Sequence, residues 1–218
     1  NELETDVWYK LVVYDSDEKY VTERNYQYSK EGNTEPLYLE VGSTFTFIAY
    51  AINNNKSESN LPVITGPTNN ADKTLSNSSV NAVYYQDLLF FHKSLIITGS
   101  TNNNLAITFE HAFNNITTTI DASATEYPLT AITANAVQTQ PNIAINFATK
   151  TVLPTGTASN PSIDFTINSA QTRATSETMV INIAQGGTIL KIANITIGPL
   201  TSANITPFSD VRLTPGTN

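Results

Sequence analysis

The sequence predicts an all-β protein of two β-sandwich domains in tandem, one over residues 1–123 and the other over residues 124–218. Three observations predict this fold class. Short runs of β-branched and aromatic residues alternate with polar residues, as in strands that bury one face. Turn-forming residues separate these runs at sandwich-like intervals. No helical periodicity is sustained, and 218 residues suffice for one large sandwich or two small ones.

The first half of the chain contains the clearest strand patterns. Residues 7–15 (VWYKLVVYD) place Val7, Tyr9, Leu11 and Val13 on one face, because side chains alternate along a strand. Further strands are expected over residues 19–28, 37–39 and 44–52, and residues 88–91 and 95–98 are apolar runs on either side of His92-Lys93. Residues 53–81 are mostly Asn, Ser, Thr, Pro and Lys, and this composition predicts a long surface loop.

Residues 104–122 are expected to form a central hairpin. Every second residue of this segment, namely Leu105, Ile107, Phe109, His111 and Phe113, would lie on the same face of a strand. After Asn114-Asn115 the apolar parity shifts by one, and a two-residue turn explains the shift because Asn tolerates the left-handed conformation. The hairpin would pair Phe109 with Ile120 and bury both beside Ile107. One long strand with a bulge at the Asn pair is the alternative.

The second half of the chain is poorer in charged and aromatic residues, and this change motivates the domain boundary at residue 123. Strands are expected over residues 143–147, 163–167, 179–183 and 189–197. Gly186-Gly187 is a strong hairpin signal, and such a hairpin would pair Ile181 with Ile192.

The composition excludes several classes of function. With 19 acidic and 11 basic residues the net charge is −8, and without a basic stripe we expect no nucleic-acid partner. Direct binding to anionic lipid is disfavoured for the same reason. The chain has no cysteine, so it has no disulfide, no thiolate catalysis and no zinc–thiolate site. No apolar run approaches the length of a membrane helix.

The sequence predicts no enzyme: no catalytic residue, no cofactor site and no metal site. His92 and His111 are the only histidines, no Gly-x-Ser-x-Gly elbow is present, and both histidines are interpreted as structural. Residues 15–18 (DSDE) superficially resemble a calcium loop. Lys19 and Tyr20 follow where an EF-hand needs an acidic residue or Asn and then Gly, so a solvated hairpin turn is expected instead.

Four segments of the first half resemble, in order, the strands of fimbrillin-like proteins of the Bacteroidetes. They are residues 9–21 (YKLVVYDSDEKYV), 42–50 (GSTFTFIAY), 87–91 (DLLFF) and 105–113 (LAITFEHAF). Together the matches span about residues 7–122. The second half is similar to that family only in its general character and not in its individual motifs.

The resemblance implies a structural, adhesive subunit of cell-surface fimbriae with two transthyretin-like, Greek-key β-sandwich domains. It implies that subunits form homo- or heteropolymers by strand exchange, with host or bacterial surfaces as targets of adhesion. It also implies export as a lipoprotein precursor to the outer membrane. The sequence has no lipobox cysteine, so an anchor would lie upstream of Asn1. Stalk, tip and anchor roles all stay open.

Two further expectations concern binding. Pro215-Gly216 is a turn signal, as though another strand should follow, and we expect a missing-strand groove that another chain fills. A cell-surface glycan-binding module is the alternative function. In that case Trp8 and the tyrosines would form a platform on which sugars stack.

Overall fold

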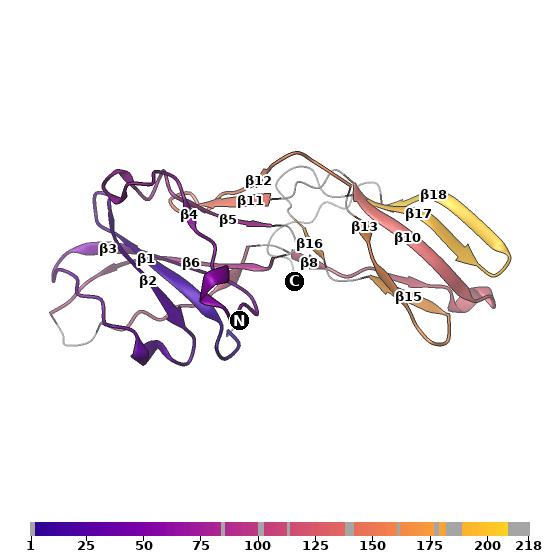
Figure 1. The fold of residues 1–218 in the computed structure, drawn as a ribbon, viewed down its shortest axis with the longest axis horizontal. Coiled ribbons are helices and arrows are strands. Elements are labelled where there is room, and N and C mark those ends of the chain that lie inside the picture. The colour runs from indigo at the N-terminus through magenta and orange to yellow at the C-terminus, as the bar shows by residue number, and fades with distance from the viewer. Residues whose placement is uncertain are drawn as a thin grey trace. The chain divides into compact units, whose positions relative to one another are not determined.

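The structure is a computed structural model that describes residues 3–83, 86–99, 103–112, 114–137, 142–160, 162–176, 179–181 and 189–208. This part of the chain is all-β, as predicted, and its only helices are four short 3-10 turns (Figure 1). These turns are η1 (Glu31–Asn33), η2 (Glu58–Asn60), η3 (Asn70–Asp72) and η4 (Ser123–Thr125). None of the helices in the described ranges is long and apolar enough to cross a membrane.

The chain divides into two compact units, which are described separately. The first unit consists of Asn1–Ala112 and Ala144–Leu153, and the second of Phe113–Ile143 and Pro154–Asn218. The predicted domains, residues 1–123 and 124–218, differ from these units in two places. Residues 113–123 group with the second unit, and residues 144–153 return to the first.

The first unit contains a five-stranded and a four-stranded antiparallel sheet (Figure 1). The five-stranded sheet has the order β2-β1-β3-β6-β7. Its strands are β1 (Trp8–Tyr14), β2 (Tyr20–Gln27), β3 (Thr44–Ile52), β6 (Leu88–Ile96) and β7 (Glu110–His111). The four-stranded sheet has the order β12-β11-β5-β4. Its strands are β4 (Ile64–Thr65), β5 (Ser79–Val83), β11 (Asn142–Asn146) and β12 (Val152–Thr155).

Both faces of the five-stranded sheet are apolar. The face predicted from residues 7–13 is confirmed, since Val7, Tyr9, Leu11 and Val13 join one buried cluster with β3 residues such as Phe47. The opposite face packs on Phe147, which follows β11 and is fully buried. The Phe147 ring lies 6.2 Å from Tyr14, 6.0 Å from Tyr50 and 6.1 Å from Phe90, measured between centroids. These contacts between the two sheets make the first unit a sandwich.

Several predicted strands of the first unit are confirmed and others are not. β1, β2 and β3 lie where the sequence predicts them. The apolar runs over residues 88–91 and 95–98 are joined by a single strand, β6, which ends at Ile96, and residues 37–39 belong to no strand. The predicted loop over residues 53–81 is wrong in part. It contains β4 and the start of β5, and its apolar residues Leu61, Leu75 and Val80 are buried.

The predicted hairpin at Asn114-Asn115 is wrong, and so is the single bulged strand. β7 pairs with β6, β8 (Asn114–Ile116) pairs with β16 (Met179–Ile181), and β9 (Thr119–Asp121) pairs with β15 (Arg173–Ser176). Ile107 and Phe109 therefore pack in the first unit, whereas Ile120 packs against a cluster of the second. Each short segment pairs with a strand distant in sequence, and local parity carries no information on such partners.

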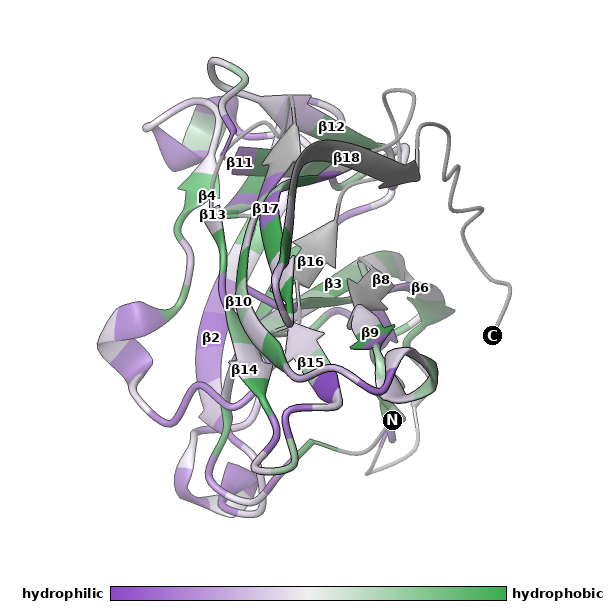
Figure 2. Ribbon diagram, turned by 90° about the vertical axis from the view of Figure 1, so that its right-hand side faces the viewer, coloured by the Kyte–Doolittle hydropathy of each residue, from purple (hydrophilic) through white to green (hydrophobic). Residues whose placement is uncertain are grey.

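The second unit is built around a sheet with the order β13-β10-β17-β18. Its strands are β10 (Leu129–Val137), β13 (Ser162–Ile163), β17 (Ile189–Ile197) and β18 (Leu200–Phe208). A three-stranded sheet has the order β14-β15-β9, with β14 spanning Phe165–Ile167. Hydrophobic bands on β14 and β17 mark the strands that face the core (Figure 2). That core contains Leu129, Ile163, Ala174, Ile192 and Ile195.

The turn between β17 and β18 requires glycine. Gly198 has φ +56°, and a Cβ atom there would lie 2.7 Å from the Tyr127 ring. Residues 182–188, which include the predicted Gly186-Gly187 hairpin, lie outside the described ranges. The predicted pairing of Ile181 with Ile192 does not form, because Ile192 has Ala134 on one side and Ile205 on the other.

Candidate functional site

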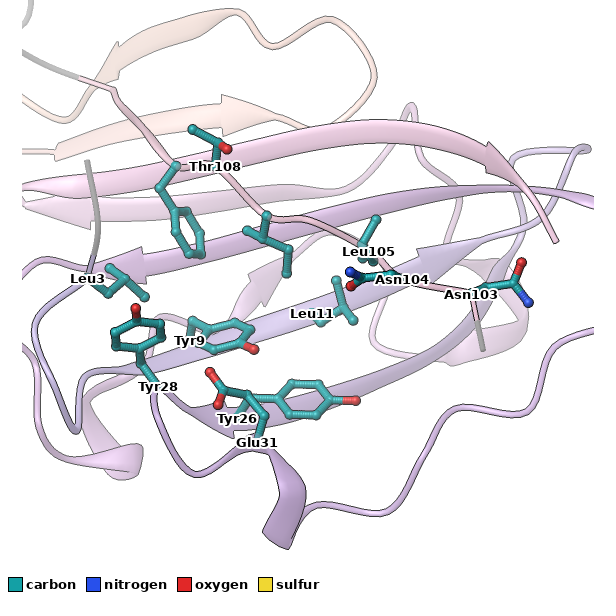
Figure 3. A pocket seen from close by; sticks show the side chains of 12 residues that line it. Leu3, Tyr9, Leu11, Tyr26, Tyr28, Glu31, Asn103, Asn104, Leu105 and Thr108 are labelled. Atoms are coloured by element: carbon teal, nitrogen blue, oxygen red, sulfur yellow. The ribbon is translucent and has the colours of Figure 1, made fainter. Parts of the chain in front are cut away.

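An apolar groove lies on one face of the five-stranded sheet in the first unit (Figure 3). Its cavity volume is about 880 Å³. The lining residues are Leu3, Tyr9, Leu11, Tyr26, Tyr28, Glu31, Asn103, Asn104, Leu105, Ile107, Thr108 and Phe109. A second hollow of about 450 Å³ shares four of them, Leu11, Tyr26, Asn103 and Leu105, so the two hollows are neighbours.

The floor of the groove is formed by aromatic side chains of β1 and β2. The rings of Tyr9 and Tyr26 are stacked, with centroids 5.4 Å apart and an interplanar angle of 18°. The Phe109 ring meets Tyr9 edge-on at 5.9 Å. β1 and β2 hold Tyr9 and Tyr26 directly opposite each other in register, which places both rings on one face.

Residues 103–109, here called the strap, cross this floor in an extended conformation. Leu105 and Ile107 are half-buried and Phe109 is 5 % exposed, whereas the residues between them are exposed. This alternation confirms the parity predicted for residues 105–109. The strap nevertheless belongs to no sheet, and within the described ranges the backbone of residues 104–109 makes no hydrogen bond.

Both ends of the strap are fixed. At one end the Asn103 side chain accepts hydrogen bonds from the Thr98 amide at 2.9 Å and hydroxyl at 3.0 Å, and donates to the Thr98 carbonyl at 3.1 Å. Beyond the other end, His111 Nδ1 lies 2.8 Å from Asp87 Oδ1. The Ala112 amide donates to the Leu88 carbonyl at 2.8 Å. His111 thus contributes to this anchoring, in agreement with its structural interpretation.

The second hollow is bordered by residues 36–41, which belong to no strand. Leu37 and Leu39 pack against the cluster of the sheet, while Tyr38 is 89 % exposed. Together with the strap, this segment covers the face of the sheet where a sandwich would place strands. Sequence reasoning found the alternation in both segments. It missed that, among the residues that the structure describes, neither segment pairs with a neighbouring strand, because alternation looks the same in paired and unpaired segments.

One carboxylate lies among the lining residues of the groove. Glu31 is the first residue of η1, and its Oε1 accepts a hydrogen bond from the Ser29 amide at 3.2 Å. Burial raises the pKa of the Tyr9 hydroxyl, and the negative charge of Glu31 raises it further. The tyrosine therefore stays neutral, and the site combines an apolar floor with one negative charge.

The residues considered for chemistry do not form a catalytic constellation among the described residues. Burial lowers the pKa of His92, with a further contribution from Lys150. Asp15 Oδ1 accepts hydrogen bonds from the amides of Asp17 and Lys19, as in the solvated turn that was predicted. Over the ranges that the structure describes, no group of three His, Cys, Asp or Glu residues could hold a metal ion. The predicted lack of a catalytic, cofactor or metal site stays a prediction.

Comparison with known proteins shows which solved structures have a similar fold. No family model matches the sequence, and no curated protein matches it. A candidate polysaccharide-binding protein from Bacteroides thetaiotaomicron has a TM-score of 0.58 at 12 % identity, over 87 % of this chain and 69 % of its own.

Two further solved structures are similar. A candidate adhesin from Bacteroides thetaiotaomicron has a TM-score of 0.56 at 12 % identity, over 93 % of this chain and 72 % of its own. A candidate cell adhesion protein from Bacteroides uniformis has a TM-score of 0.52 at 15 % identity, over 88 % of this chain and 74 % of its own. The chain therefore has the fold of these Bacteroides structures, which agrees with the resemblance of its first half to fimbrillin-like proteins.

Proposed function

We propose that this chain is a structural, adhesive subunit of cell-surface fimbriae, and that it joins other subunits by accepting a β-strand in its apolar groove. The observation that carries the proposal is the strap. It is extended, anchored at both ends and unpaired along its backbone within the described ranges, and it crosses an apolar floor. Unpaired strand edges beside apolar grooves bind added strands, as in donor-strand complementation.

The energetics favour a durable contact. A donated strand that buries four or five large apolar side chains gains roughly 6–15 kcal/mol, at about 1.5–3 kcal/mol each. Association and ordering costs of about 4–15 kcal/mol oppose this gain. The contact is therefore durable only when the apolar side chains of the donated strand are fully buried. A groove of about 880 Å³ offers room for several such side chains.

The remaining parts of the proposal concern where the subunit acts. It would be exported as a lipoprotein precursor and displayed at the outer membrane through a lipid anchor. Its partners would be copies of itself or other fimbrial subunits, and its targets host or bacterial surfaces. Similarity in fold to candidate adhesins supports this part. No step requires an enzyme activity.

A glycan-binding function is the second candidate, and the similarity to a candidate polysaccharide-binding protein favours it. Sugars stack on open aromatic faces. In the groove, Tyr9 and Tyr26 stack on each other and Phe109 packs against Tyr9, so these rings already use their faces within the protein. The groove therefore fits an apolar strand better than a sugar.

Polymer formation by the subunit with its natural flanking segments tests the proposal. We expect Ile107→Lys, which places a charge on the inward side of the strap, to abolish polymers seen by size-exclusion chromatography and electron microscopy. Ala106→Lys, on the exposed side, is the matched control and should polymerise normally. Circular dichroism establishes that both variants fold. Normal polymerisation by a folded Ile107→Lys variant would refute the proposal, and binding of glycan arrays by a monomer would favour the alternative.

A further inference from the structure

We infer that the strap is the hydrogen-bonding template for the incoming strand, and that this strand alternates apolar with polar residues and carries a basic residue where it passes Glu31. This inference rests on the proposed function and deepens it. It names the segment that pairs with the partner and the chemistry of that partner.

The backbone of the strap is the first argument. An extended segment offers amide and carbonyl groups along both edges, and an unpaired edge is a template for pairing with another chain. Within the described ranges residues 104–109 use none of them in backbone hydrogen bonds. A neighbouring strand satisfies these groups without any change in the conformation of the strap.

Preorganisation of the strap is the second argument. Asn103 holds one end through three hydrogen bonds to Thr98, and the contacts of Ala112 and His111 hold the chain beyond the other end. Much of the conformational entropy of the strap is thus lost before the partner arrives. The incoming strand then loses mainly its own entropy, which favours tight pairing.

The floor of the groove defines the side chains of the partner. The strap directs Leu105, Ile107 and Phe109 toward the sheet and its other residues toward solvent. A strand paired with it has the same pleat, so alternate side chains of that strand also point at the floor. Tyr9, Leu11 and Tyr26 line that floor, and they suit large aliphatic side chains (Figure 3).

The charge of Glu31 defines which residue the partner strand carries at the position beside it. Among the described residues that line the larger groove, Glu31 is the charged one, and its carboxylate is close enough to Tyr9 to raise the pKa of that hydroxyl. An acidic residue on the incoming strand would meet repulsion there, whereas lysine or arginine would form an ion pair. At a solvent-facing site this pair changes affinity by up to about fivefold.

Backbone amide exchange, measured by NMR on the whole chain, tests the template. The probe is a short synthetic peptide that alternates isoleucine with threonine and ends in lysine, and the control is a scrambled peptide of the same composition. We expect the alternating peptide to bind and the scrambled one not to bind. On binding, every second amide within residues 104–109 should exchange at least about tenfold more slowly.

The outcomes separate the inference from the proposed function. A peptide that binds without slowing exchange at residues 104–109 overturns the template. An alternating peptide that fails to bind, while polymerisation still depends on Ile107, overturns the partner chemistry and leaves the proposed function intact. Failure of both peptide binding and polymerisation overturns both.

The charge of Glu31 is tested by a matched pair of peptides. Glu31→Gln should weaken binding of the lysine-ended peptide by up to about fivefold, and leave a threonine-ended peptide unaffected. Equal effects on both peptides would show that Glu31 does not recognise the basic residue.

Discussion

Replacing Phe109 by alanine tests how the strap is held on the sheet. The Phe109 side chain is 5 % exposed and meets the Tyr9 ring edge-on at 5.9 Å. Truncation of a buried phenylalanine costs about 3–5 kcal/mol, through lost transfer free energy and the cavity left behind. We expect Phe109→Ala to lie near the low end, about 3 kcal/mol, because the space left behind adjoins a groove of about 880 Å³ and water can refill it.

Phe147→Ala is the comparison, because its site is closed. Phe147 is 0 % exposed and packs within about 6 Å of three aromatic rings. Its truncation should cost near the upper end, about 5 kcal/mol. Trp8 is the only tryptophan and lies on β1, so its fluorescence reports unfolding of the first unit. Urea titration followed at Trp8 gives both free energies of unfolding.

With a urea m-value of about 1–3 kcal/mol/M, a loss of 3 kcal/mol lowers the denaturation midpoint by about 1–3 M. An unchanged midpoint for Phe109→Ala would show that its face is misassigned. A loss for Phe109→Ala equal to or larger than that for Phe147→Ala would show that the strap encloses its side chains as tightly as a second sheet does.

Three further predictions concern the first unit. Glu23→Gln removes the negative charge that lies 2.6 Å from Lys10 Nζ, and the Lys10 side chain is 12 % exposed. The free energy of unfolding in urea should fall by about 1–2 kcal/mol, and a gain in stability would contradict this. Asn103→Ala releases Thr98 and one end of the strap, so limited proteolysis should cut the strap faster than in the unmodified protein, and an equal rate would refute the anchoring role. Burial, with a contribution from Glu23, raises the pKa of the Tyr14 hydroxyl from 10.0 to about 12. The unfolded chain therefore loses this proton at a lower pH than the folded chain does, and the free energy of unfolding should fall as the pH rises from 10 to 12. Tyr14→Phe should flatten that fall in an alkaline titration, and an identical slope would refute the assignment.

Sequence patterns predicted the strands that are rich in β-branched and aromatic residues. β1, β3 and β17 have this composition, and all three appear where expected. β10 and β18 were not predicted, since Ala, Thr and Asn dominate them and give little contrast between faces. These strands are specified by their neighbours, because β10 lies between β13 and β17 and pairs with both.

The sequence by itself determined the all-β class, the parity of the strap and the lack of cysteine and basic patches. The partners of each segment were decided only by the tertiary structure. The inward parity of Ile107 and Phe109 was correct, yet Ile120, the predicted partner of Phe109, packs against the core of the other unit. Alternation depends on residues two apart, so it is local and can be read from the chain. Strand pairing depends on the hydrogen bonds and apolar surfaces of segments far away in sequence. Whether residues 104–109 find a backbone partner within the described ranges is therefore decided by the tertiary structure.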